Sequence, residues 1–85
     1  MRLQDRTAVI TGGGRGLGRA IAERFLAEGA KVLLADVDAA TLVKTAEELG
    51  CLSCPTDVAE KDQIDRMVAT AIEAFGHIDI LRYIV

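Results

Sequence analysis

A cluster of glycines marks the part of the sequence best suited to chemistry. Five glycines lie within seven residues of the run TGGGRGLG, residues 11–18, and Gly12, Gly16 and Gly18 follow the spacing G-x-x-x-G-x-G. A diphosphate needs nearby backbone N–H donors and positive potential, which a helix N-terminus supplies where no Cβ blocks the approach. Gly12 can form the turn, Gly14 and Gly16 leave room for phosphates, and Gly18 lets the helix pack near a strand. A structural turn without ligand is the alternative, but so many glycines carry an entropy cost that packing alone rarely requires.

The spacing separates this loop from two other glycine-rich phosphate loops. It differs from the G-x-G-x-x-G fingerprint, and Arg19 and Ala20 stand where a Walker A loop needs Lys and Ser or Thr. The loop follows an expected strand and opens an expected helix, which is the context that gives such a pattern meaning.

An acidic residue follows the loop at a distance that suits a ribose. Asp36 ends the run KVLLAD, 18 residues after Gly18. A carboxylate there can accept hydrogen bonds from both adenosine ribose hydroxyls and would repel a 2′-phosphate, which favours NAD over NADP. Arg15 keeps NADP open, because a guanidinium in the loop could pair with that phosphate. The alternatives are a helix cap shared with Asp38 for Asp36, and a solvated loop residue for Arg15.

A second acidic residue, Asp57, follows the third apolar segment. Its carboxylate could accept the adenine amino group while the backbone of Val58 meets the ring nitrogens. Alternatively, Asp57 is the N-cap of the next helix, since Glu60 stands at capping-box spacing from it. Both roles can coexist.

The sequence gives little reason to assign a function to the two cysteines or the histidine. Cys51 and Cys54 form a C-x-x-C in an expected strand, where the odd spacing sends the two side chains to opposite faces. We therefore expect reduced packing residues and neither a disulfide nor a metal site. His77 follows a helix-ending glycine, and we expect it in a surface loop.

The elements that must position these residues alternate along the chain. Apolar runs predict strands over residues 7–11, 31–36, 51–56 and 78–85, and helical periodicity predicts helices that end at Gly29, Gly50 and Gly76. The order β-α-β-α-β-α-β predicts an α/β, Rossmann-like three-layer fold with a parallel sheet in the order 3-2-1-4, half of a doubly wound fold. The first two helices should cover one face and the third the other. We expect residues 1–85 to form one domain.

Bulk composition excludes several classes of function. The chain has 85 residues and a net charge of −3, without a basic run or a Cys/His finger, so nucleic acid is not an expected partner. The apolar runs are far shorter than the ~20 residues of a membrane helix, and the charged N-terminus does not resemble a signal peptide. We therefore expect a cytoplasmic protein without a membrane partner.

Four motifs in order resemble the N-terminal part of a classical short-chain dehydrogenase/reductase over residues 3–81. They are TGGGRGLG, the acidic end of LLAD, the pair Asp57-Val58, and FGHIDIL at residues 75–81. The resemblance implies a diphosphate site lined by Gly12, Arg15, Gly16, Leu17 and Gly18. It also implies that Asp36 and Val37 meet the ribose, and that Asp57 and Val58 meet the adenine.

The chain departs from the family pattern after Leu81. The family usually continues Val-Asn-Asn-Ala-Gly, whereas this chain reads Arg82-Tyr83-Ile84-Val85, and the family's catalytic Ser and Tyr-x-x-x-Lys are absent. We therefore expect a truncated NAD-binding portion of an alcohol/carbonyl oxidoreductase that is not itself catalytic. The alternatives are the N-terminal part of an active enzyme, a self-associating scaffold without ligand, and an S-adenosylmethionine site. The exposed edge of the strand at 78–85 predicts a homodimer through that edge.

Overall fold

The computed structural model describes residues 3–12, 14 and 16–82. Strands and helices alternate there as β1 Thr7–Thr11, α1 Gly16–Ala27, β2 Lys31–Asp36, α2 Ala39–Leu49, β3 Leu52–Pro55, α3 Lys61–Phe75 and β4 Ile80–Arg82. This confirms the predicted order of elements. Two strands are shorter than predicted: β3 covers 52–55 instead of 51–56, and β4 covers 80–82 of the predicted 78–85, whose residues 83–85 lie outside the described part.

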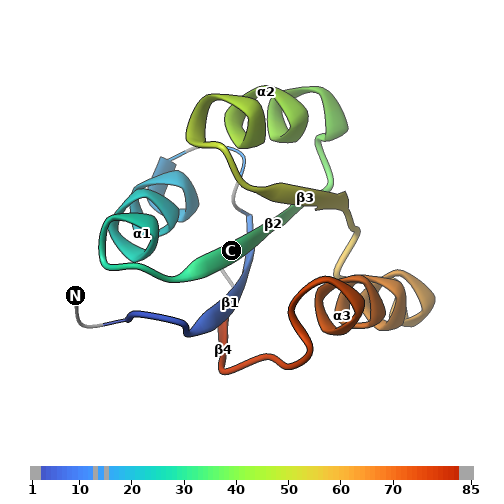
Figure 1. The fold of residues 1–85 in the computed structure, drawn as a ribbon. Coiled ribbons are helices and arrows are strands. Elements are labelled where there is room, and N and C mark those ends of the chain that lie inside the picture. Colours follow the sequence, from blue (N-terminus) through green and yellow to red (C-terminus); the bar gives the residue numbers. More distant parts are fainter. Residues whose placement is uncertain (1–2, 13, 15, 83–85) are drawn as a thin grey trace.

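The four strands form one parallel sheet in the order β3-β2-β1-β4, as predicted (Figure 1). β1 lies between β2 and β4, with Val9 opposite both Leu33 and Leu81. Because the strands are parallel, the carboxyl ends of β1, β2 and β3 meet at one edge of the sheet. Ligands of open α/β sheets bind at that edge, near the point where the strand order reverses.

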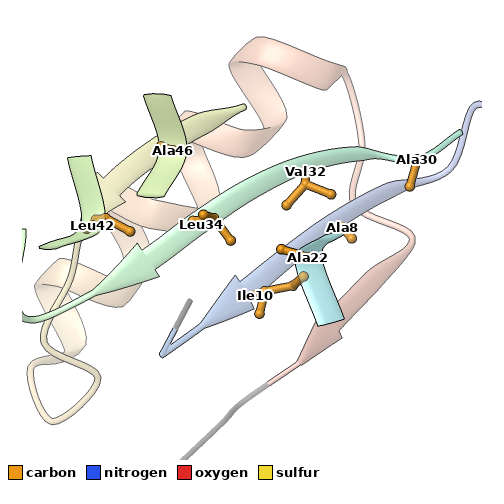
Figure 2. Close-up of a cluster of buried hydrophobic side chains, with 8 residues drawn as sticks. All are labelled: Ala8, Ile10, Ala22, Ala30, Val32, Leu34, Leu42 and Ala46. Atoms are coloured by element: carbon orange, nitrogen blue, oxygen red, sulfur yellow. The ribbon is translucent and has the colours of Figure 1, made fainter. Parts of the chain in front are cut away.

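Helices cover both faces of the sheet, with α1 and α2 on one side and α3 on the other (Figure 1). Alternate residues of β1 and β2 point to opposite faces, so Ile10 and Leu34 pack towards α1 and α2, whereas Val9 and Leu33 pack towards α3. Figure 2 shows the first cluster, in which Ala22 of α1 and Leu42 of α2 face the two strands. Because both faces of the sheet are buried, the sequences of the central strands are continuous apolar runs.

The two cysteines lie on opposite sides of the sheet, as predicted from their spacing. Cys51 packs against the cluster under α1 and α2, and Cys54 belongs to the cluster under α3. Both thiols are free, and burial raises the pKa of the Cys51 thiol. Their side chains therefore act as small packing groups.

Helix ends follow local signals at α2 but not at the start of α3. Asp38 caps α2 by accepting the backbone N–H of Thr41 at 3.2 Å, and Gly50 ends it with φ 72°. The predicted capping box of Asp57 and Glu60 is wrong, because Glu60 is the N-cap and its side chain makes no capping hydrogen bond. Asp57 instead accepts the N–H of Ala59 at 2.9 Å, which closes a local turn before the helix.

A hydrogen-bonded cluster ties the amino ends of β1 and β4 together. Asp79 accepts the backbone N–H of Thr7 at 2.9 Å and contacts Nε2 of His77 at 3.0 Å, while the Thr7 hydroxyl donates to the His77 carbonyl at 2.7 Å. The Thr7 N–H, followed by His77, holds the pKa of Asp79 below its ordinary value. His77 is exposed, as predicted, but the sequence interpretation missed its pairing with Asp79.

Candidate functional site

A small cleft opens where the carboxyl ends of β1, β2 and β3 meet. Its volume is about 140 Å³, and seven residues line it: Thr11, Gly12, Asp36, Val37, Thr56, Asp57 and Val58. Five of these, all but the two threonines, are residues that the sequence singled out as candidates. The parallel topology explains the convergence, because each segment directly follows a strand of the same sheet.

The glycine loop continues from this cleft into the N-terminus of α1. Gly12 and Gly16 have φ angles of 68° and 61°, in the left-handed region where a side chain is strained. A Cβ on Gly16 would meet no atom within 4 Å, so the space in front of it is open. The first turn of α1 holds no acidic residue, so its N–H groups keep their positive potential for an anion. Gly12, Gly16 and the first turn of α1 therefore offer the open backbone and the positive potential that a diphosphate needs.

The other predicted loop residues occupy different environments. Gly18 is buried in α1, which suits its predicted role in close packing, whereas the Leu17 side chain is 64% exposed beside it. Arg15 lies outside the described residues, so its predicted contact with phosphate stays a prediction. The helix N-terminus consequently presents backbone donors beside one exposed apolar side chain.

Gly14 is required for close approach and not for a left-handed φ. A Cβ there would lie 2.8 Å from Oδ2 of Asp36, which is closer than side-chain atoms pack. Its N–H donates to that same oxygen at 3.0 Å, and its carbonyl accepts the hydroxyl of Thr45 in a buried hydrogen bond. Because its N–H is engaged by Asp36, Gly14 shapes the loop through contacts within the protein.

Asp36 joins the loop to the cleft. Oδ2 accepts the N–H of Gly14, and Oδ1 accepts the N–H of Asp38 at 3.2 Å. The predicted alternative of a shared helix cap is wrong for Asp36, since Asp38 alone is the N-cap of α2. Each carboxylate oxygen has a second lone pair, so Asp36 retains acceptor capacity on the cleft side.

Two valines give the cleft apolar walls beside its carboxylates. Val37 is 70% exposed and Val58 is 47% exposed, although apolar side chains of this size are usually buried. Asp57 lies between the end of β3 and Val58, with its backbone N–H donating to Oε1 of Gln63 at 2.8 Å. Such walls suit a flat, largely apolar ring that also carries polar edge atoms.

Sequence reasoning missed Thr45 and Thr56 at this site. Thr56 is buried and bonds its hydroxyl to the Cys54 carbonyl at 2.9 Å, while its N–H donates to the Asp36 carbonyl at 2.9 Å. Thr45 occupies a core position of α2 between Leu42 and Ala46. A hydroxyl on an apolar helix stripe is the signal that could have identified it, because a buried donor needs a partner.

A larger hollow lies at the opposite end of the sheet. It has a volume of about 370 Å³ and is lined mainly by apolar residues, among them Leu26, Val32, Cys51 and Phe75. It is remote from the strand carboxyl ends and from the glycine loop, so size alone does not locate the site.

Within residues 3–12, 14 and 16–82, no three His, Cys, Asp or Glu side chains are grouped to hold a metal ion. None of the helices in those ranges is long and apolar enough to cross a membrane.

Comparison with known proteins gives consistent matches. The short chain dehydrogenase family model matches residues 6–84. An uncharacterized oxidoreductase of Mycobacterium bovis is 46% identical over 83 residues, which cover 93% of this chain and 34% of the relative. A sorbitol dehydrogenase of Cereibacter sphaeroides is also 46% identical over 83 residues, covering 95% of this chain and 32% of the relative. The chain thus spans about a third of the length of the curated relatives it matches.

Solved structures match the fold closely. A short chain dehydrogenase/reductase from Burkholderia phymatum in complex with NAD superposes with a TM-score of 0.91 at 37% identity, covering 95% of this chain and 31% of the other. A 3-ketoacyl-(acyl-carrier-protein) reductase from Brucella melitensis complexed with NADH gives 0.90 at 37% identity, covering 93% and 33%. Both structures hold a nicotinamide dinucleotide.

Proposed function

The chain belongs to the short-chain dehydrogenase family, and on that premise we propose that it is the NAD-binding N-terminal part of an oxidoreductase that interconverts an alcohol and a carbonyl. Three lines of support converge: the family match, the NAD and NADH in the matched structures, and the cleft beside the glycine loop. Activity is proposed for the whole protein, of whose relatives this chain spans about a third. For the chain itself we propose cofactor binding.

The observation that carries the proposal is the continuity of the Asp36 cleft with the glycine loop. We assign the diphosphate to the loop and the first turn of α1, the ribose to Asp36 and Val37, and the adenine to Asp57 and Val58. The loop residues so assigned are Gly12, Arg15, Gly16, Leu17 and Gly18, and Gly14 belongs to the site as the residue that shapes the loop. The cleft, at about 140 Å³, is smaller than the roughly 300–1,000 Å³ of ligand pockets, which suits a site for only the adenosine end of a ligand whose diphosphate lies on the open loop.

NAD is the proposed cofactor in preference to NADP, and Asp36 is the reason. Its carboxylate would repel a 2′-phosphate, whereas the 2′-hydroxyl of NAD could donate to it. When bound, NAD supplies the acceptor for the hydride of an alcohol substrate. The residues of this chain bind its adenosine and diphosphate and thereby orient the molecule along the carboxyl edge of the sheet.

We propose homodimerisation through β4. This strand pairs with β1 on one side and is the last strand of the described sheet. Leu81 shares the α3 face with its register partner Val9 and is 42% exposed. A second copy paired along β4 would satisfy the strand edge and cover this side chain. Light scattering at micromolar concentration is expected to give twice the chain mass, and a monomer would overturn this part of the proposal.

A cytoplasmic location is proposed from the sequence and from the state of the cysteines. Cys51 and Cys54 are free thiols, which suits a reducing compartment. Fractionation of the source cells with an antibody against the chain is expected to place it in the cytoplasmic fraction; recovery in an exported fraction would contradict this.

Calorimetric titration tests the assignment of the cofactor. NAD, NADP, ADP-ribose and S-adenosylmethionine are titrated separately into the chain. We expect NAD and ADP-ribose to bind, NADP to bind about tenfold more weakly because of Asp36, and S-adenosylmethionine to give no heat. If none of the four binds at millimolar concentration, the proposed function fails and a ligand-free scaffold is left.

A further inference from the structure

Gly14 is held from two sides by residues distant in sequence. Asp36 of β2 accepts its N–H, and Thr45 of α2, which is 2% exposed, donates its hydroxyl to the Gly14 carbonyl. We propose that Thr45 is a positioning residue for the diphosphate loop: its hydroxyl orders the loop from α2 and so raises affinity for the phosphate-bearing part of the cofactor. This inference rests on the proposed function and adds a residue to it.

The direction of the Thr45 hydroxyl separates it from an ordinary helical threonine. Threonine in a helix commonly bonds to a carbonyl one turn earlier in the same helix. Thr70 of α3 does this, with its hydroxyl 2.8 Å from the Arg66 carbonyl. Thr45 instead reaches out of α2 to a loop residue 31 positions away. Thr45 thus links two elements, whereas Thr70 serves only its own helix.

The need for such a link follows from the loop's composition. A glycine-rich loop loses much conformational freedom when it is ordered on a ligand, and ordering it beforehand reduces that cost. At Gly14 the fit is close: an added Cβ would lie 2.8 Å from Oδ2 of Asp36 and 3.5 Å from Cγ2 of Thr41. Position 14 therefore lies against β2 and α2, held by both hydrogen bonds, and a side chain there would push against the Asp36 carboxylate.

Titration with three ligands that differ in their phosphate groups distinguishes positioning of the diphosphate loop by Thr45 from general support of the fold. Thr45→Val keeps the size of the side chain but removes the donor, Thr45→Ser keeps the donor, and Thr70→Val is the matched control on α3. Each is titrated with NAD, ADP and adenosine. We expect Thr45→Val to weaken NAD and ADP about tenfold, the effect of one buried hydrogen bond, and to leave adenosine within about twofold.

The controls set the conditions under which the inference stands. Thr45→Ser should recover most of the affinity, to within about threefold of wild type, and Thr70→Val should match wild type for all three ligands. Unchanged ADP binding in Thr45→Val overturns the inference. So does an equal loss for ADP and adenosine, because that is the result of damage to the whole fold.

A measurement without ligand separates failure of this inference from failure of the proposed function. Amide hydrogen exchange of Gly14 is compared in wild type, Thr45→Val and Thr70→Val, since its N–H is bonded to Asp36. We expect about tenfold faster exchange in Thr45→Val alone. If NAD does not bind wild type but this acceleration occurs, the proposed function fails and the positional link stands. Unchanged exchange overturns the link. Should Thr45→Val not fold, Thr45→Ala removes the same hydroxyl donor, and the same selective loss of ADP over adenosine is expected, with unchanged ADP binding again overturning the inference.

Discussion

Two aspartates at opposite ends of the sheet have contrasting surroundings. Asp36, at the carboxyl end of β2, accepts one backbone N–H on each oxygen and faces a cleft. Asp79, just before β4 at the amino end, accepts the N–H of Thr7, contacts the His77 ring, and lies 3.6 Å from the Arg6 guanidinium. The first carboxylate borders a cleft that a ligand can enter, whereas the second, although at the surface, is paired with groups of its own chain.

The difference teaches how this small fold separates stability from recognition. The bonds of Asp79 join residues 72 positions apart and fasten β4 to β1. Among the described residues of the glycine loop beside Asp36, Gly14 is held by hydrogen bonds with Asp36 and Thr45. Recognition sites generally give up some stability to keep groups available for a ligand. Replacing the aspartate at each end should therefore change different properties. Loss of Asp36 should weaken ligand binding, and loss of Asp79 should lower stability.

Asp36→Ala is expected to have the largest effect on ligand binding. We expect the loss of the carboxylate proposed to accept two ribose hydroxyls, together with the loss of its hydrogen bond to Gly14, to weaken NAD binding about 100-fold and to reduce the preference for NAD over NADP. Calorimetry gives both affinities. Asp79→Ala is the matched control and should bind NAD within about twofold of wild type. Equal losses from the two substitutions would remove the distinction between the two ends.

Asp79→Asn is expected to lower the thermal stability of the fold without changing its affinity for NAD. The substitution keeps the size of the side chain but removes the charge that Arg6 and His77 face. We expect a lower midpoint of thermal unfolding and an unchanged dissociation constant for NAD in the folded state. Circular dichroism on heating measures the first and calorimetry the second. An unchanged midpoint would show that this cluster does not fasten the strands.

The stability that Asp79 contributes should depend on pH in a defined direction. Its pKa is lowered in the folded state from the ordinary value of 3.8, with the Thr7 N–H as the main cause. A lowered pKa stabilises the fold fully above that ordinary value, and the contribution is lost as the pH falls towards the folded-state pKa. The difference in unfolding midpoint between wild type and Asp79→Asn should therefore persist at pH 6 and shrink towards pH 3. A gap that widens on acidification would contradict the direction of the shift.

Two glycines with similar backbone conformations, one in the loop and one remote from it, allow the comparison with the smallest expected effect. Gly16 and Gly50 have φ angles of 61° and 72°, and an added Cβ would meet no atom within 4 Å at either position. Alanine should cost about 1 kcal/mol of unfolding free energy at both, because both need a left-handed backbone. Only Gly16→Ala should also weaken NAD, by about tenfold, since its Cβ would enter the space assigned to phosphate. Urea denaturation and calorimetry give the two quantities, and parallel NAD affinities would argue against a phosphate at Gly16.

The sequence predicts most of this fold because its signals are local. Apolar runs mark the strands, and Asp38 and Gly50 delimit α2 as expected. The capping box at Asp57 was wrong because a carboxylate three residues before a glutamate is a common spacing, and the helix begins after Glu60. The links from Thr45 to Gly14 and from Thr7 to Asp79 were not predicted, since each joins residues that only the tertiary fold brings together.

An NMR titration of the isotope-labelled chain with NAD locates the ligand directly. Amide shifts are expected to change at Gly12, Gly16, Leu17, Asp36 and Val58, at the carboxyl end of the sheet, while those of Thr7, Cys51 and Asp79 stay in place. Shifts confined to the amino end, or to the hollow around Cys51, would contradict NAD binding at the glycine loop.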